Sequence, residues 1–328
     1  MTELSSTEPV KLTVEARAHG WRLDHYLARL FPNYSRAAFQ RAIIQQTVLV
    51  NGLPGKSGRR LHVNDQLSVQ LPEEPDETLP PEDIPLDILY EDDSLVVINK
   101  AADMVVHPGK GNYRGTLAGA LQFHFDKLSD VAGKLRAGIV HRLDRNTTGV
   151  MVVAKDNQVH SRLSSQFERR EITKEYWAIV WGQIEFDSDL IETHLRVNRK
   201  HREKMEVCEP GGNSREAVTW YEVLERFPYA TSVKLLPKTG RTHQLRVHMS
   251  HLGHPIVADS QYRGRSDIRQ ADLEGRHDTA ESPVIISRQA LHARRLCFRH
   301  PESGKPMEFE APLPADMQAT LEILSRAR

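Results

Sequence analysis

The pattern of apolar and polar residues predicts short strands that alternate with isolated helices over most of the chain. Short apolar runs and alternating segments, each bounded by polar residues, predict buried strands. The clearest of these cover residues 95–99, 150–154 and 174–181. Further strands are expected at 218–224, 232–236, 288–298 and 307–312, and further helices at 116–125 and 314–328. Such a mixture is compatible with an α+β fold.

Two of the helices expected in this part of the chain are marked by residues that are typical of helix ends. Asp156 can cap a helix in which apolar residues recur at four-residue spacing from Val159 onward. A second helix is predicted over 242–252, because Gly253 follows it at the position where helices commonly end. Arg246 lies inside this second helix.

The first seventy residues follow a different pattern and predict a separate small domain. Leucines at helical spacing over 22–31 predict one helix, and Phe39 and Ile43 lie on the apolar side of the next. A strand at 48–50 leads into an Asn-Gly pair, which is typical of tight hairpin turns. A strand at 66–71 closes this unit.

Prolines among acidic residues mark the boundary between the two parts. Five prolines lie within 72–85, where like charges repel one another and proline restricts the backbone to extended conformations. We therefore expect a small N-terminal domain over 1–71, an acidic linker over 72–85 and a large domain over 86–328. Such a linker leaves the two domains free to reorient.

Charge is distributed unevenly although the chain of 328 residues has a formal net charge of zero. Residues 1–70 hold nine Lys and Arg against five Asp and Glu, whereas residues 71–93 hold ten acidic residues and no basic one. The remaining 235 residues hold 35 basic and 29 acidic residues, a net charge of +6. Attraction to phosphate depends on the local field, so this balance permits RNA binding without demonstrating it.

The cysteine content and the hydropathy of the chain indicate the cellular compartment in which we expect the protein. Two cysteines argue against a disulfide framework and fit a reducing environment. The first twenty residues include three glutamates and no apolar run, so they do not resemble a signal peptide. No apolar segment approaches the length of a membrane span, and we expect a cytoplasmic protein without a membrane partner.

The polar loop at 141–149, His-Arg-Leu-Asp-Arg-Asn-Thr-Thr-Gly, is the strongest candidate site. It precedes the predicted buried strand at 150–154, and loops at the ends of buried strands commonly carry reactive groups. Its one carboxylate, Asp144, lies between Arg142 and Arg145. A carboxylate beside cations suits a nucleophile or a general base. The alternative is that Asp144 only caps a turn through its own backbone.

This loop resembles the central motif of the RluA-type pseudouridine synthases, whose usual form has Ser where this chain has Thr148. Further stretches match the family in order, and together they extend from about residue 20 nearly to the C-terminus. They are 84–93, 96–100, 106–109, 170–176 and 239–249. The Val-His-Pro-Gly sequence at 106–109 and the N-terminal extension most resemble the RluD branch, which acts on large-subunit ribosomal RNA. Ala101 replaces a proline that is usual in the family.

The resemblance implies a catalytic domain built around a large mixed sheet, which converts uridine to pseudouridine within RNA and needs no cofactor. Asp144 matches the catalytic aspartate, which either attacks C1′ or promotes elimination of uracil. Arg246 matches the arginine that pairs with this carboxylate, and Tyr176 matches the aromatic residue on which the target base stacks. Arg142 matches the residue that fills the space left by an extruded nucleotide.

The N-terminal domain resembles the S4 RNA-binding domain, a small α/β module. We expect five basic residues on its second helix and the following loop to contact phosphates: Arg36, Arg41, Lys56, Arg59 and Arg60. The alternatives are a solubilising domain with scattered surface arginines, or a domain that binds a protein partner. A basic segment over 185–212 is expected to form an insertion that touches RNA, although charged runs are often only solvated surface.

Three functions compete on this reading. The first is a pseudouridine synthase for large-subunit (23S) ribosomal RNA, free or in a pre-ribosomal particle; the second is a synthase for transfer RNA; the third is a non-catalytic S4-type RNA-binding protein. A metal hydrolase is a distant fourth. Its candidate ligands are His243, His248, His251 and His254. No pair of them has the four-residue spacing of helical zinc ligands, and we expect no metal.

Overall fold

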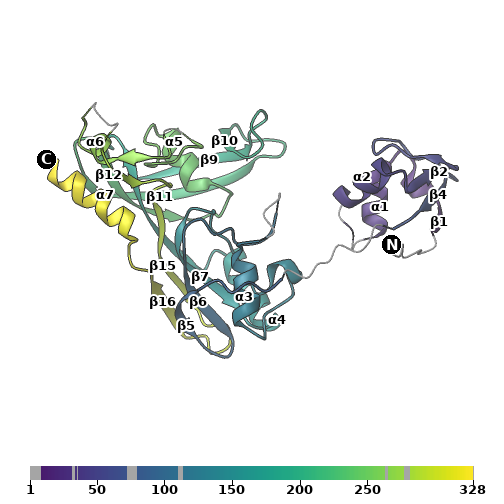
Figure 1. Ribbon diagram of the computed structural model, residues 1–328, viewed down its shortest axis with the longest axis horizontal. Helices are drawn as coiled ribbons and strands as arrows, with labels where there is room; N and C mark the ends of the chain where they lie inside the picture. The colour runs from purple at the N-terminus through teal and green to yellow at the C-terminus, as the bar shows by residue number, and fades with distance from the viewer. Residues whose placement is uncertain are drawn as a thin grey trace. The chain divides into compact units, whose positions relative to one another are not determined.

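The computed structural model describes residues 9–31, 34, 36–71, 80–109, 114–262, 265–276 and 281–327 (Figure 1). Contacts divide the chain into two compact units, Met1–Thr78 and Leu79–Arg328. The predicted boundaries at residues 71 and 86 stay predictions, and residues 72–79 of the predicted linker lie outside the described residues. Residues 80–85 are described, and they lie against the C-terminal unit. Glu82 accepts a hydrogen bond from the Gly115 amide, and its own amide donates to the Gly119 carbonyl.

The N-terminal unit combines two helices with a four-stranded sheet, of which the sequence predicted the helices and the strands at 48–50 and 66–71. The strand order is β1 (Val10–Thr13), β4 (Gln66–Val69), β2 (Val48–Val50) and β3 (Leu53–Pro54), with α1 (Leu23–Leu30) and α2 (Arg36–Ile44) packed against it. A single 3₁₀ turn, Ala16–Ala18, precedes α1. The apolar faces of both helices meet the sheet in one core that includes Leu23, Leu27 and Phe39. This unit therefore has a core of its own.

The C-terminal unit is built on one ten-stranded mixed sheet. Its path is β10 (Met205–Cys208), β9 (Ser188–Val197), β11 (Arg215–Arg226), β12 (Ala230–Pro237), β8 (Thr173–Trp181), β15 (Leu291–Arg299), β7 (Thr148–Ala154), β6 (Leu95–Lys100) and β5 (Asp87–Glu91), with β16 (Pro306–Glu310) also paired to β15. β15 and β7 pair in parallel, and the other pairs are antiparallel. The predicted large mixed sheet and α+β class are confirmed.

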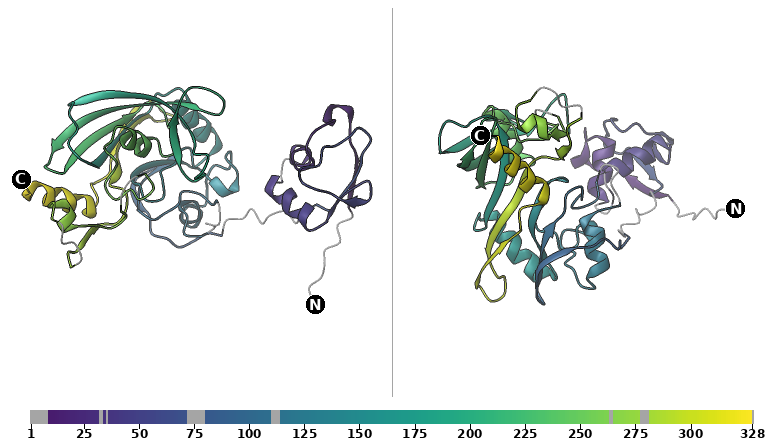
Figure 2. Two further views of the ribbon diagram at one scale, coloured as in Figure 1. Left: turned by 90° about the horizontal axis from the view of Figure 1, so that it is seen from above. Right: turned by 60° about the vertical axis from the view of Figure 1, so that its left-hand side comes forward.

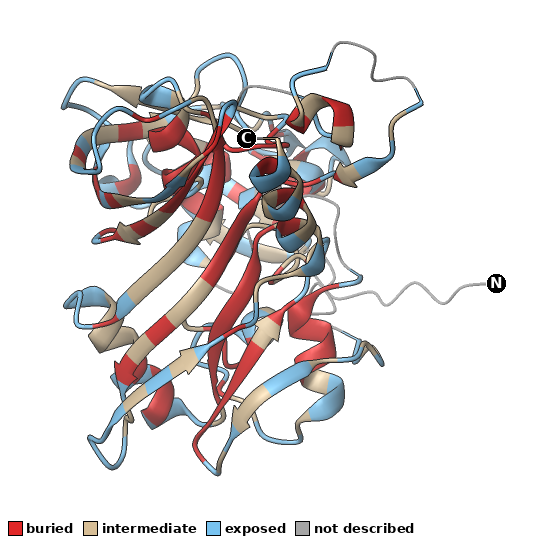
Figure 3. Ribbon diagram, turned by 90° about the vertical axis from the view of Figure 1, so that its left-hand side faces the viewer, coloured by how far each residue is buried: buried red, intermediate tan, exposed pale blue. Residues whose placement is uncertain are grey.

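β7 lies at the centre of one half of this sheet and is buried at all seven positions (Figure 3). Its alternate residues serve two different cores. Val150 and Val152 pack with α4 (Asn157–Glu168), while Met151 and Val153 pack with α3 (Leu117–His124) on the opposite face. A continuous apolar run is what a strand covered on both faces requires. The short 3₁₀ turn Lys134–Arg136 leads toward this strand.

The other half of the sheet carries a second core, beneath α5 (Gln244–His251) and the C-terminal helix α7 (Ala315–Arg326). α7, drawn in yellow in Figure 2, packs against α6 (Gln270–Leu273) and the short strand β14 (Val284–Ile286), which pairs with β13 (Ile268–Arg269). Met249 of α5 and Met317 of α7 belong to the same cluster of buried side chains. This half therefore positions α5 over strands β8, β11 and β12.

The segment 185–212 is not the separate insertion that its polar composition predicted. β9 and β10 lie within this segment and extend the main sheet, with β9 hydrogen-bonded between β10 and β11. Only Ile191 and Leu195 of β9 are fully buried, so the strand has too little apolar content to be recognised from its sequence. Its expected contact with RNA stays a prediction.

Gly149 lets β15 approach β7 closely at the end of the central loop. Its φ of 116° lies where L-residues are strained, and a Cβ at this position would lie 2.2 Å from the carbonyl oxygen of Ala293. Ala293 is its register partner in the parallel pair, and Lys100 is its partner on the other side. No side chain fits between these strands, so glycine is required for the sheet to be continuous here.

Replacing Gly149 by alanine should lower the free energy of unfolding by roughly 2–4 kcal/mol, because backbone strain adds to a clash with β15. The matched control is Gly211→Ala, at a φ of 144° where an added Cβ meets nothing within 4 Å. That variant should lose only about 1–2 kcal/mol. Chemical denaturation of both variants measures the difference, and equal losses would show that the close approach of β15 is unimportant.

Candidate active site

The central loop is anchored to the sheet at its start by His141. The Nε2 atom of this side chain accepts a hydrogen bond of 3.0 Å from the Val152 amide on β7, and its ring stacks on Phe167 of α4 at 4.6 Å. Burial, and secondarily the charge of Lys174, lowers the pKa of His141 to about 3. The ring therefore stays neutral and keeps Nε2 as an acceptor at physiological pH. His141 has a structural role.

Two buried cations hold the far end of the loop from beneath. The Lys100 ammonium donates to the carbonyl oxygens of Ala101, Met104 and Arg145 at 2.7–3.0 Å. Burial lowers the pKa of Lys100 to about 7. Arg288 donates to the Asn146 carbonyl at 3.2 Å. Loop carbonyls that would otherwise lack partners are thereby paired, which fixes the backbone at Arg145 and Asn146.

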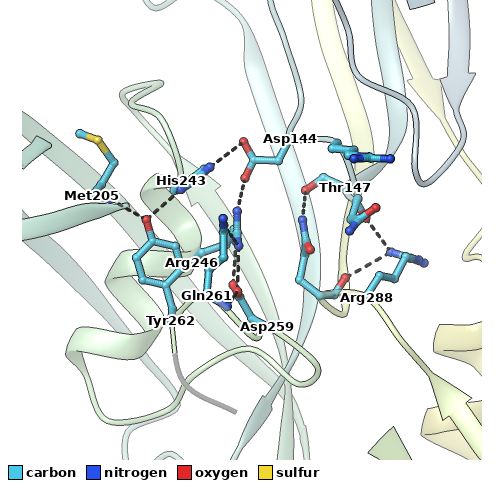
Figure 4. Close-up of polar contacts among 12 residues, drawn as sticks. Asp144, Thr147, Met205, His243, Arg246, Asp259, Gln261, Tyr262 and Arg288 are labelled. Atoms are coloured by element: carbon cyan, nitrogen blue, oxygen red, sulfur yellow. Dashed lines mark hydrogen bonds and ion pairs between the residues drawn. The ribbon is translucent and has the colours of Figure 1, made fainter. Parts of the chain in front are cut away.

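Asp144 directs its carboxylate out of the loop and toward α5. The turn itself is closed by the backbone carbonyl of Asp144, which accepts from the Thr147 amide at 3.0 Å. The carboxylate Oδ2 instead accepts from Nη1 of Arg246 at 3.0 Å, across 102 residues of sequence (Figure 4). Within the described residues no backbone amide donates to this carboxylate. The turn-capping alternative therefore does not describe the side chain of Asp144.

Arg246 is shared between two carboxylates. Its Nε and Nη2 donate to Oδ2 and Oδ1 of Asp259 at 2.6 and 2.8 Å, and Nη2 also donates to Gln261 at 2.7 Å (Figure 4). The Arg246 side chain is 5% exposed and that of Asp259 is 1% exposed. Burial opposes the charge of Arg246, but hydrogen bonding and attraction to Asp259 and Asp144 outweigh it and raise the pKa of the guanidinium. Only the Nη1 edge is left for Asp144.

His243 lies beside the same carboxylate, immediately before α5. Its Nε2 is 3.9 Å from Oδ1 of Asp144, and its Nδ1 is 2.8 Å from the hydroxyl of Tyr262. The Tyr262 hydroxyl also accepts from the Met205 amide at 2.8 Å, and the Arg246 guanidinium lies over the tyrosine ring. The backbone of His243 is left-handed, with φ 54° and ψ 18°. The predicted helix thus begins two residues later than expected, at Gln244.

Asp144 and Arg246 line two adjacent cavities of about 480 and 580 Å³. Both volumes are in the range of ligand sites in proteins. Tyr176 lines the first cavity together with Lys174, Lys238 and Arg241. The second is lined by His107 and Arg145, and Arg142 borders both. Burial, and then the charge of Asp144, raises the pKa of Tyr176, so its hydroxyl keeps its proton at neutral pH.

The structure thus brings together Asp144, Tyr176, Arg246 and Arg142, the four residues that the resemblance placed at the site, and their roles stay predictions. The partners Asp259, Gln261 and Tyr262 were not predicted, and His243 was considered only as a metal ligand. A run of polar and aromatic residues over 259–262 directly follows Ala258, whose φ is 59°. The position of these polar residues after a buried apolar segment was the one sequence signal for a site here. Their distance along the sequence from Arg246 does not indicate that they contact it.

The five basic residues predicted to contact RNA lie in the N-terminal unit, and three of them also make contacts within it. Arg36 donates to the buried carboxylate of Asp24 at 2.9 Å. Burial opposes the charge of Asp24, but hydrogen bonds from its neighbours hold its pKa well below the usual range. Arg60 donates to the Gly20 carbonyl, and Arg59 lies 3.9 Å from Asp65. Arg41 and Lys56 are exposed.

Three of the four histidines considered as metal ligands have hydrogen-bond partners within the protein, and His243 is described above. His248 lies between the hydroxyls of Thr193 and Thr219 at 2.9 and 3.0 Å, and His254 contacts the Trp181 carbonyl. Among the described residues, no three His, Cys, Asp or Glu side chains are grouped closely enough to hold a metal ion. Every helix within the described ranges is too short or too polar to cross a membrane.

Comparison with known proteins places this site in a family. The RNA pseudouridylate synthase model matches residues 94–251, and the S4 domain model matches residues 21–67. Ribosomal large subunit pseudouridine synthase D of Escherichia coli O157:H7 is 43% identical over 95% of this chain and 93% of its own length. An uncharacterized RNA pseudouridine synthase of Chlorobaculum parvum is 42% identical over 92% and 93%.

Solved structures agree with this assignment. Human RNA Pseudouridylate Synthase Domain Containing 4 has a TM-score of 0.55 and 27% identity, and the match covers 73% of this chain and 93% of that one. Human RNA Pseudouridylate Synthase Domain Containing 1 has a TM-score of 0.53 and 29% identity, and the match covers 71% of this chain and 85% of that one. High identity over nearly the full length of the bacterial relatives is decisive. This chain belongs to the RluA-type pseudouridine synthase family and is an isomerase with an S4 domain.

Proposed function

We propose that this enzyme isomerises specific uridines in large-subunit ribosomal RNA, free or within a precursor particle, and that Asp144 is its catalytic carboxylate. The observation that carries the proposal is the position of Asp144. Its carboxylate borders two cavities, is held at Oδ2 by Arg246 and leaves Oδ1 without a hydrogen bond within the described residues. The large-subunit target is supported by the relatives named synthase D.

The reaction exchanges one bond to ribose C1′ for another and is balanced without a cofactor. The bond from C1′ to N1 breaks, the bond from C1′ to C5 forms, C5 loses its proton, and N1 ends protonated. The free oxygen of Asp144 can attack C1′ or take a proton from C2′ to start the elimination of uracil. Both routes need a carboxylate that reaches the sugar from one side, which the cavity geometry provides.

Each neighbouring residue has a role that its position supports. Tyr176 offers a partly buried aromatic wall in the first cavity, on which an extruded uracil can stack. A nucleotide inside a stem must leave the helix before its C1′ can reach Asp144. Arg142 is exposed at the border of both cavities, where its long side chain can occupy the space left in the stem.

Asp144→Asn should stop pseudouridine formation while the fold and the RNA affinity survive, because the change removes the charge at nearly constant volume. Release of tritium from RNA labelled at C5 of uridine measures turnover, and filter binding on the same preparation measures affinity. Turnover comparable to wild type would contradict the role of Asp144.

The same variant tests the RNA target in cells. Cells that lack the gene should lose pseudouridines in large-subunit ribosomal RNA, and the wild-type gene should restore them whereas Asp144→Asn should not. Loss of pseudouridines from transfer RNA alone would replace the proposed target.

Arg246→Lys should reduce kcat by roughly 100-fold or more with little change in RNA affinity. A lysine keeps the charge, but one ammonium group cannot meet both edges of Asp259 and also reach Asp144. Single-turnover kinetics at saturating enzyme separate the chemical step from binding. A wild-type rate in this variant would show that the planar guanidinium is unnecessary.

Removing residues 1–80 should weaken RNA binding and flatten its dependence on salt, because the N-terminal unit carries the five predicted phosphate contacts. The remaining chain keeps Glu82 and its contacts to Gly115 and Gly119. Each lost contact should reduce the slope of log K against log salt by about 0.7–0.9. An unchanged affinity and slope in the truncated enzyme would contradict a role of this unit in RNA binding.

A further inference from the structure

The hydrogen bonds around Tyr262 fix which nitrogen of His243 carries a proton. The Met205 amide can only donate, so the Tyr262 oxygen accepts there, and its own proton is available for Nδ1 of His243. No other acceptor within the described residues lies in hydrogen-bonding range of this hydroxyl. Burial raises the pKa of Tyr262 to about 12, so the phenol keeps its proton. Nδ1 of His243 therefore accepts.

The imidazole of His243 is neutral, which places its one proton on Nε2. Burial lowers the pKa of His243; the charges of Asp144 and Asp259 act against this, and those of Arg246 and Arg142 add to it. These four groups and Tyr262 are the charged and titratable neighbours that face the ring. With Nδ1 occupied as an acceptor, a neutral ring has Nε2–H as its donor, and this nitrogen is the one that faces Asp144.

The distance from Nε2 to Oδ1 of Asp144 is 3.9 Å, about 1 Å longer than a hydrogen bond. Arg246 already holds Oδ2 of the same carboxylate, and both donors come from the start of α5. His243 also borders both cavities, so a bound nucleotide would touch it and Asp144 together. Hydrogen bonds at catalytic groups commonly shorten when substrate binds.

The backbone of His243 gives a second, independent indication of function. A left-handed conformation costs a non-glycine residue of the order of 1–2 kcal/mol. His243 is the N-cap residue of α5, yet its side chain makes no capping hydrogen bond. Asparagine, like histidine, is one of the residues that adopt this conformation most readily, so His243→Asn can keep the backbone. Helix stability does not explain a histidine here, and strained residues of this kind are concentrated at functional sites.

We propose that His243 is a positioning residue for Asp144: when RNA fills the cavities, its Nε2–H donates to Oδ1, and Tyr262 holds the ring in the tautomer that makes this possible. Arg246 and His243 then hold the two oxygens of one carboxylate. Because each oxygen has two lone pairs, Oδ1 remains able to react. The inference rests on the proposal that Asp144 is the catalytic carboxylate.

The tautomer is tested first, without reference to activity. In enzyme labelled with ¹⁵N-histidine, the signals that disappear in His243→Asn identify this ring, and they should show a protonated Nε2 and an unprotonated Nδ1. Tyr262→Phe removes one oxygen and should shift this ring toward a mixture of tautomers. A protonated Nδ1 in the wild-type enzyme would overturn the inference.

The kinetic test uses a pair of substitutions at position 243. The amide nitrogen of Gln can take the place of Nε2, whereas that of Asn is too short to reach Asp144. His243→Asn should lower kcat by about 100-fold with unchanged KM and no loss of thermal stability. The kcat of His243→Gln should be at least about tenfold higher than that of His243→Asn. Equal kcat values for the two variants, or a wild-type kcat for His243→Asn, would contradict the proposal.

Tyr262→Phe should lower kcat by about tenfold, the effect of one misdirected hydrogen bond. Its matched control is Tyr90→Phe on β5, which loses a hydroxyl bonded to Asp92 and should keep its kcat. Equal kcat values in the two variants would overturn the role of Tyr262.

Asp144→Asn separates the proposal for His243 from the proposal that Asp144 is catalytic. If that variant is inactive while His243→Asn is fully active, only the role of His243 fails; if Asp144→Asn is active, the catalytic assignment itself fails.

Discussion

The candidate active site depends on one guanidinium that is shared by two carboxylates. An arginine alone with Asp144 would favour a bidentate pair, which would engage both of the carboxylate oxygens. Asp259 prevents this, since it takes the Nε and Nη2 edge and leaves only Nη1 for Asp144. A second buried carboxylate therefore keeps one oxygen of the first available for chemistry. The arrangement places two negative charges and one positive charge in a largely buried site, which makes it sensitive to the loss of any partner.

That geometry requires two distant parts of one sheet to be held rigidly. Asp144 precedes β7, whereas Arg246 belongs to α5, which packs over the half of the sheet with β8, β11 and β12. The two halves meet at β15, which pairs with β7 on one side and β8 on the other. Gly149 permits the first of these pairings and Lys100 fixes the loop above it. Packing of the sheet thus sets the distance between the two charged groups.

The sequence predicted those elements whose signal is local. β7 followed from an apolar run, and α4 from the spacing of its apolar residues and from Asp156, which accepts hydrogen bonds from the first turn. β9 was not found, because a strand with few buried residues lacks the alternation on which such predictions depend. Asp259 was not found either, since its pairing with Arg246 is made through a turn and leaves no periodic pattern. The left-handed backbone of His243 before α5 was not predicted either.

Attraction to RNA depends on the local field of a protein and not on its total charge. Arg246 is offset by Asp144 and Asp259 together, so these three groups carry a net negative charge. Arg142 and Arg241 line the first cavity outside this group of three. A negative charge beside Asp144 repels phosphates, whereas cations elsewhere in the cavity attract them, and an uncharged sugar is not repelled. The proposed function therefore needs the two kinds of charge at different places in the site, and the formal net charge of zero indicates neither.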